Sequence, residues 1–113
     1  MSTKFLKNID AEEVLSIADL VDYAPGQVVS RTLVQNGAVS ITVFSFDEDE
    51  EISSHSSDGD AMVTILEGKA IVTIGTMRHP LTAGQTIVMP AGIPHAVRAD
   101  GPFKMYLTVV FPV

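Results

Sequence analysis

From residue 28 onward, hydrophobic and polar residues follow the period of two that is typical of β-strands. The runs 28–33 and 39–44 both alternate in this way, and the dipeptide Asn36-Gly37 lies between them. Asn-Gly readily adopts the positive φ angles of a tight two-residue turn. The pattern therefore predicts a β-hairpin at the start of the strand-rich part of the chain.

Further strands are predicted downstream, where β-branched residues cluster between Gly and Pro turn signals. These strands lie at 60–67, 70–74, 78–81, 85–89, 95–99 and 103–110. Many short strands with almost no helix predict an all-β fold, either a sandwich or a closed barrel.

One segment, NIDAEEVLSIADLVDYAPG, has a helical pattern instead. Asp10 is a candidate N-cap, and Glu13 stands three residues later, as in a capping box. Val14 and Val21 fall on one face at helical spacing, and Pro25 ends the pattern. We therefore expect a short N-terminal helix that packs on the outside of the strands.

The length of 113 residues fits a single domain, which we divide into an N-terminal helical segment, 1–26, and a barrel, 28–110. The chain contains no cysteine. Disulfides, thiolate metal sites and cysteine nucleophiles are therefore excluded.

The charge balance also narrows the possible partners. A net charge of −7 argues against nucleic acid, whose phosphates require clustered Lys and Arg. The acidic run DEDEE, 47–51, is expected to be a solvated loop. No apolar run has the length of a membrane span and the N-terminus does not resemble a secretory signal, so we expect a cytoplasmic protein without a membrane partner.

A glycine, a short strand, a rigid corner and a histidine follow one another in GQTIVMPAGIPHAV. The spacing is Gly84, five residues, Pro90, one residue, Gly92, two residues and His95. This segment resembles the second motif of the cupin superfamily. It departs from the motif only at the last position, where Ala99 replaces asparagine.

The first cupin motif is also recognisable, but it is degenerate. When the motif is aligned on Gly68, its first histidine falls on His55, and its second histidine position is occupied by Ser57. Ala61 stands where the family has glutamate, and Asp49 stands where it has the leading glycine. The chain thus resembles a small single-domain cupin, which implies a double-stranded β-helix, or jelly-roll barrel, that is often a homodimer.

In metal-binding cupins, the histidines and the glutamate at these positions hold a divalent ion inside the barrel. The resemblance keeps His55 and His95 as possible metal ligands, and it implies at most a weakly held divalent transition metal. Asp58 and Asp60 are weaker candidates that could supply an oxygen ligand. Against this, Asp58 belongs to an Asp-Gly pair, which is itself a turn signal.

Several functions stay open at this point. The first is a barrel that binds a small molecule, with His55 and His95 as its polar contacts. The second is a metal-dependent enzyme of the dioxygenase, decarboxylase or isomerase type. The third is metal-free acid/base catalysis of the kind found in epimerase relatives, with either histidine as base and Tyr106 as proton donor if its side chain points inward. A barrel that mainly forms a dimer is the fourth.

His79 matches no ligand position, and we expect it to be a partly exposed strand residue.

Overall fold

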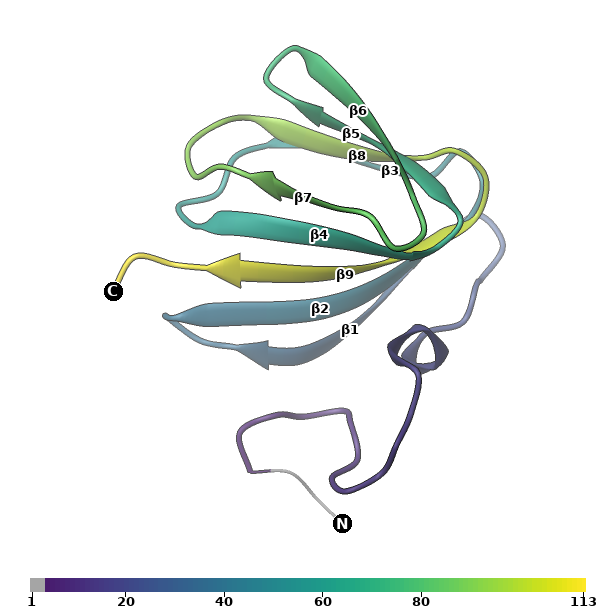
Figure 1. Cartoon of the computed structure of the whole chain (residues 1–113), viewed down its shortest axis with the longest axis vertical. Helices are drawn as coiled ribbons and strands as arrows, with labels where there is room; N and C mark the ends of the chain where they lie inside the picture. The colour runs from purple at the N-terminus through teal and green to yellow at the C-terminus, as the bar shows by residue number, and fades with distance from the viewer. Residues whose placement is uncertain (1–3) are drawn as a thin grey trace.

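Two antiparallel β-sheets face each other in the computed structural model, which describes residues 4–113 (Figure 1). One sheet has five strands in the order β1-β2-β9-β4-β7, and the other has four in the order β3-β8-β5-β6. This arrangement confirms the predicted jelly-roll fold class. The strands are β1 (Val28–Gln35), β2 (Val39–Phe46), β3 (Glu51–His55), β4 (Asp60–Glu67), β5 (Lys69–Ile74), β6 (Met77–Thr82), β7 (Thr86–Met89), β8 (His95–Ala99) and β9 (Phe103–Val110).

The predicted hairpin joins β1 to β2, which pair along their lengths from Val28 opposite Phe46 to Gln35 opposite Ser40. In the turn, the side-chain oxygen of Asn36 accepts hydrogen bonds from the next backbone N–H groups, at 2.8 and 3.0 Å. An Asn side chain that satisfies local N–H groups is a common way to stabilise a turn.

The structure also contains a strand that the pattern did not predict. β3 begins at Glu51, the last residue of the acidic run, and pairs with β8.

Earlier in the acidic run, the Asp47 carboxylate accepts hydrogen bonds from the N–H groups of Gly26 and Glu48, at 2.6 and 2.8 Å. These two bonds lower the pKa of Asp47, although burial acts weakly in the opposite direction. The run is therefore partly structural and not only a solvated loop.

The main hydrophobic core lies between the two sheets. Its centre contains Phe46 of β2 and Phe103 of β9, which are opposite each other in register and stack with ring centroids 4.4 Å apart. Val63 and Val72 contribute from β4 and β5, one from each sheet, and both are fully buried. Alternation of inward and outward side chains along each strand produces this core directly.

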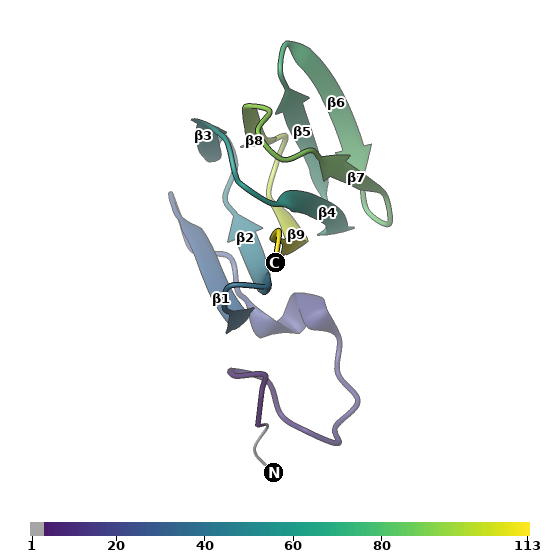
Figure 2. The same ribbon diagram turned by 90° about the vertical axis from the view of Figure 1, so that its left-hand side faces the viewer.

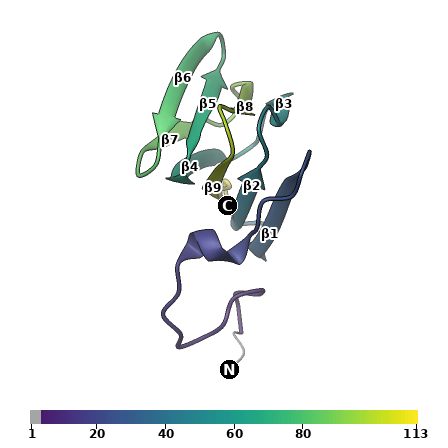
Figure 3. The same ribbon diagram turned by 90° about the vertical axis from the view of Figure 1, so that its right-hand side faces the viewer.

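A second cluster lies on the outer face of the five-stranded sheet, where Val21, Leu33 and Val43 are buried. The N-terminal segment covers this face. Figures 2 and 3 show the segment beside β1 and β2, on the side of the molecule away from β5 and β6.

The prediction of an N-terminal helix is wrong in both the extent and the type of the helix. Within residues 4–113, only η1 (Ile17–Leu20) is helical, and it is a single 3-10 turn. Glu12 has φ 60, which interrupts any α-helix that starts at Asp10, and Val14 is fully exposed instead of packed. Residues 1–3, the beginning of the expected 1–26 segment, lie outside the described residues.

Tertiary contacts explain why the helix is replaced. The N–H of Lys7 donates to the carbonyl of Leu33, and the Asn8 side chain donates to the carbonyl of Thr32, both at 2.8 Å. The chain is thus held along β1 at Lys7 and Asn8, just before the expected start of the helix at Asp10.

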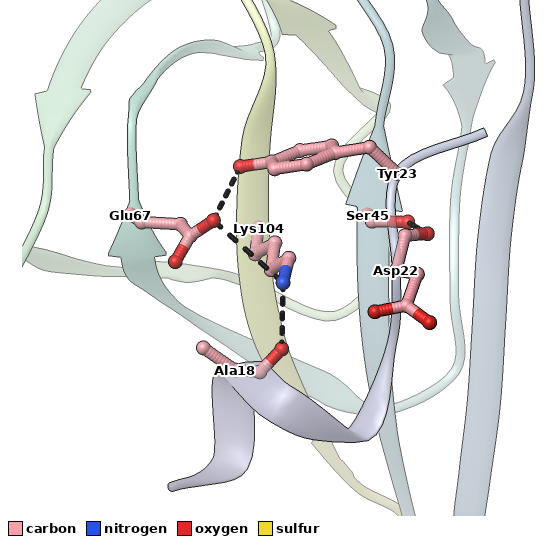
Figure 4. A network of polar contacts seen from close by, with 6 residues as sticks. All are labelled: Ala18, Asp22, Tyr23, Ser45, Glu67 and Lys104. Carbon is pink, nitrogen blue, oxygen red and sulfur yellow. Dashed lines mark hydrogen bonds and ion pairs between the residues drawn. The ribbon is translucent and has the colours of Figure 1, made fainter. Parts of the chain in front are cut away.

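A polar network joins this segment to the barrel (Figure 4). Lys104 of β9 is buried, and its Nζ donates to the carbonyl of Ala18 at 2.8 Å and lies 3.7 Å from Glu67 Oε1. The Tyr23 hydroxyl donates to the same Glu67 oxygen at 2.7 Å, and Ser45 Oγ donates to the carbonyl of Asp22. Burial, together with the bond to Glu67 and its charge, raises the pKa of Tyr23, so its phenol stays protonated.

Among residues 4–113, no helix has the length and hydrophobicity needed to span a membrane.

Candidate functional site: a histidine pair at the mouth of a cavity

His55 and His95, which are forty residues apart in sequence, meet at one end of the four-stranded sheet. His55 ends β3 and His95 begins β8, and the two residues are register partners across this strand pair. Their ring centroids are 4.5 Å apart, in an edge-to-face arrangement. The two histidines that the motifs single out therefore form one site.

The two rings differ in exposure. His95 keeps 3% of its surface accessible, whereas His55 is exposed. His55 is the last residue of β3, and the pairing of β3 with β8 is irregular between Ile52 and His55. His55 thus lies at the mouth, and His95 lies beneath it.

Both rings are oriented by backbone carbonyls two residues earlier. His55 Nδ1 lies 3.0 Å from the carbonyl oxygen of Ser53, and His95 Nδ1 lies 3.2 Å from that of Ile93. Burial lowers the pKa of His95 below its usual value, the bond to the Ile93 carbonyl acts against this, and the charge of nearby His55 lowers the pKa further. His95 is therefore a neutral imidazole at neutral pH.

A cavity of about 500 Å³ opens beside the histidine pair, between the two sheets. Its wall is mainly apolar, with side chains from both sheets and the C-terminal residues. The polar residues gather on the loop that follows β3, together with the two histidines. The apolar lining consists of Phe44, Ile52, Ala61, Met89, Val97, Met105, Leu107, Val109 and Phe111, and the polar lining of His55, Ser56, Ser57, Asp58 and His95.

The corner of the second motif holds the polar loop in place. Gly92 has φ 77, and its N–H donates to the carbonyl of Ser57 at 2.8 Å. The N–H of Ala91 donates to the carboxylate of Asp60, also at 2.8 Å. Gly59 packs tightly, since a Cβ there would lie 2.5 Å from the carbonyl oxygen of Val110. The two motifs are thus joined by backbone contacts.

The donors present do not match a transition-metal site. Among residues 4–113, no group of three or more His, Cys, Asp or Glu side chains is arranged to hold a metal ion. Ala61 lines the cavity but has no donor, and Ser57 Oγ accepts the N–H of Gly59. Of the two candidate aspartates, Asp60 is bound to the Ala91 N–H, and Asp58 lines the cavity at an exposed position. Two imidazoles without a third ligand leave a divalent ion weakly held.

Tyr106 and His79 lie away from this site. Tyr106 packs in the cluster on the outer face of the five-stranded sheet, whereas its neighbours Met105 and Leu107 line the cavity. Tyr106 is therefore not placed as a proton donor there. His79 is a partly exposed residue of β6, paired with Val72 of β5.

Most of the apolar lining was not singled out from the sequence. The alternation of β9 is the signal that could have found it, because Met105, Leu107 and Val109 share one parity and all face the cavity. Ser56 has no comparable signal, since it lies in an irregular loop.

The fold and the site together define a small jelly-roll barrel with a histidine pair at its mouth. Residues 42–111 match the Cupin domain family, and the chain belongs to this family.

Solved structures agree with the fold over nearly the whole chain. A conserved protein of unknown function from Streptococcus pyogenes is 49% identical, with a TM-score of 0.96, and the match covers 100% of this chain and 99% of that one. A cupin superfamily protein from Desulfitobacterium hafniense DCB-2 is 32% identical, with a TM-score of 0.92, covering 96% of this chain and 100% of that one.

Among curated proteins, the HTH-type transcriptional regulator PuuR of Escherichia coli (strain K12) is 29% identical over 92 residues. The match covers 77% of this chain and 49% of the regulator, so the chain spans about half the length of the curated relative that it matches.

Proposed function

We propose that this cupin binds a small, largely apolar molecule in the cavity beside His55 and His95. The observation that carries the proposal is the cavity itself, whose volume of about 500 Å³ lies in the range of small-molecule sites. An apolar wall would supply most of the binding free energy by removing ligand surface from water. The histidine pair and the loop beside it would orient a polar group of the ligand.

The likeness to a transcriptional regulator supports a binding role over a catalytic one. The described residues contain one 3-10 turn and no α-helix, so the match does not rest on a helix-turn-helix. The shared region is thus a barrel, and a barrel within a regulator is suited to bind a signal molecule.

The test is an NMR titration of the whole chain with 1-hexanol, a neutral probe that fits an apolar cavity. We expect chemical-shift changes at the cavity residues, with Val97 and Leu107 among them. Ala61→Leu should reduce the affinity, because Ala61 is buried and faces the cavity. Ala96→Leu is the matched control, since Ala96 has the opposite parity on β8 and does not line the cavity.

Equal affinities for Ala61→Leu and Ala96→Leu would contradict the proposal, provided that both variants keep the far-ultraviolet circular dichroism of the wild type. Shifts confined to the outer face of the barrel would contradict it as well.

A further inference from the structure

The cavity presents hydrogen-bond acceptors and negative charge, but no fixed positive charge. The titratable groups in its lining are His55, His95 and Asp58, and none of its described lining residues is Lys or Arg. The chain as a whole carries a net charge of −7. A negatively charged ligand would therefore meet an unfavourable field both in the cavity and during its approach.

The tautomers of the two histidines add hydrogen-bond acceptors to the cavity. A carbonyl oxygen can only accept a hydrogen bond, so Nδ1 of His55 and Nδ1 of His95 each carry the proton in their contacts with Ser53 and Ile93. In a neutral imidazole, the other ring nitrogen, Nε2, then holds a lone pair. Burial of His95 favours this neutral form. The pair thus offers two nitrogen acceptors, and the Asp58 carboxylate lines the same cavity.

We infer that the ligand carries a protonated amine on an apolar body, with the ammonium group on the polar side of the cavity, which His55, His95 and Asp58 line. An ammonium group has three N–H donors and no acceptor, so it complements the imidazole nitrogens and the carboxylate, and the hydroxyls of Ser56 and Ser57 can accept from it as well. The apolar body would occupy the wall formed by residues such as Phe44, Met105 and Leu107. This inference rests on the proposed function, since it assigns a ligand class to the same cavity.

The binding of an amine should depend on pH in a defined direction. Protonation of His95 removes its Nε2 lone pair and adds positive charge, so amine affinity falls as the pH is lowered, and carboxylate affinity rises. The nearest other charged groups on these strands are Glu51 and Arg98, which are opposite each other at the far end of the β3–β8 pair and are exposed. In β5, the residue paired with His95 is Ile74, which does not titrate.

Three probes with the same six-carbon body test the inference: hexylamine, 1-hexanol and hexanoate. Each is titrated into the whole chain by NMR at pH 7.5 and at pH 5.5, with EDTA present throughout. At pH 7.5 we expect hexylamine to bind about tenfold more tightly than hexanoate, which corresponds to a single favourable charge interaction replaced by an unfavourable one. The preference should be smaller at pH 5.5 than at pH 7.5.

Two variants then separate the effect of the Asp58 carboxylate on amine binding from the effect of the net charge of the chain. Asp58→Asn should weaken hexylamine binding about two- to fivefold, as expected for an exposed ion pair, and leave 1-hexanol binding unchanged. Glu13→Gln makes the same change in net charge within the N-terminal segment, away from the cavity, and should leave both probes unaffected.

The possible failures are distinguishable. Hexanoate binding at pH 7.5 that equals or exceeds hexylamine binding would overturn the amine assignment and leave the small-molecule cavity intact. Hexylamine binding that Asp58→Asn does not change would overturn it in the same way. If none of the three probes shifts the cavity residues, both the inference and the proposed function are overturned.

Discussion

At the scale of single residues, His95 shows how position determines protonation. Its ring is buried beneath His55 and its Nδ1 contacts the Ile93 carbonyl. Burial outweighs this contact and lowers the pKa, because a charged imidazolium loses more hydration than the neighbouring groups restore. A group with a lowered folded-state pKa binds its proton more tightly in the unfolded chain, so acid favours unfolding.

We therefore expect the free energy of unfolding to fall as the pH drops below 6.5, the ordinary histidine pKa, toward the lower pKa of folded His95. Urea denaturation at pH 7.5, 6.5 and 5.5 measures this slope. His95→Asn should flatten it, whereas His79→Asn, at a partly exposed site in β6, should leave it steep. Identical slopes for wild type and His95→Asn would show that His95 does not carry the effect.

Gly68 is a second residue whose position restricts which amino acid can occupy it. It turns the chain from β4 to β5 with φ +79, and a Cβ there would press against the Pro102 carbonyl and Phe103. Both the backbone conformation and the space therefore require glycine.

Gly68→Ala is expected to reduce the free energy of unfolding by about 3 kcal/mol or more, the sum of a left-handed backbone and a clash with neighbouring backbone. Gly75→Ala provides the control, because Gly75 has φ +60 but nothing lies near its missing Cβ. It should cost only about 1–2 kcal/mol. Equal losses in the two variants, measured by chemical denaturation, would mean that the contact with Pro102 contributes nothing.

At the scale of elements, the N-terminal segment is held mainly by hydrogen bonds to the backbone and side chains of the barrel. Lys104 supplies a buried anchor to the Ala18 carbonyl, and its Nζ lies 5.0 Å from the centroid of the Tyr23 ring. When the segment undocks, the ammonium group loses its hydrogen bond to the Ala18 carbonyl and keeps the pair with Glu67 at 3.7 Å, so the anchor and the segment stabilise each other.

Lys104→Met keeps the apolar stem of the side chain and removes its charge. We expect a loss of about 2 kcal/mol in the free energy of unfolding, because the Ala18 carbonyl and Glu67 lose a charged partner. Amide hydrogen exchange should accelerate in η1 and at Tyr23 before it does in the strands. Lys69→Met, at an exposed position of β5, should change the stability by less than about 0.5 kcal/mol. Unchanged exchange in η1 would rule out the anchor.

At the scale of the whole molecule, the two sheets enclose a core at one end and a cavity at the other. Phe46 and Phe103 fill the closed end, whereas His55, Asp58 and Phe111 stand around the cavity. The barrel is thus rigidly packed where the strands converge and accessible where the motif loops meet.

The resemblance to cupins, which are often homodimers, leads to a prediction about assembly. We expect sedimentation velocity to give a species of about twice the 12.1 kDa of one chain at micromolar concentration. The dimer should dissociate on dilution according to mass action. A single species of 12.1 kDa at the highest concentration would contradict this prediction.

Most of the strands could be predicted because their signal is local. Alternation with period two places one set of side chains toward the core, as in Val63 and Ile65 of β4, and turn residues mark where each strand ends. The second motif indicated the direction of His95 for a similar reason, since the corner at Pro90 and Gly92 precedes it directly in the chain.

Other features were decided only by tertiary structure. β3 carries no clear alternation and exists because β8 provides a partner for it. The helical pattern around Asp10 gave way to contacts with β1, which no local propensity encodes. Motif spacing singled out His55 together with His95, and their rings lie 4.5 Å apart, but only the structure revealed that His55 is exposed.

The sequence by itself thus determined the fold class, the order of most strands and the two histidines of the site, because periodicity, turn chemistry and motif spacing are properties of neighbouring residues. Only the tertiary structure decided the path of the N-terminal segment, the outward direction of Tyr106, and the existence of a cavity whose wall comes from both sheets. These features depend on contacts between residues far apart in the chain, and the free energy of such contacts is set by the packing of the whole domain.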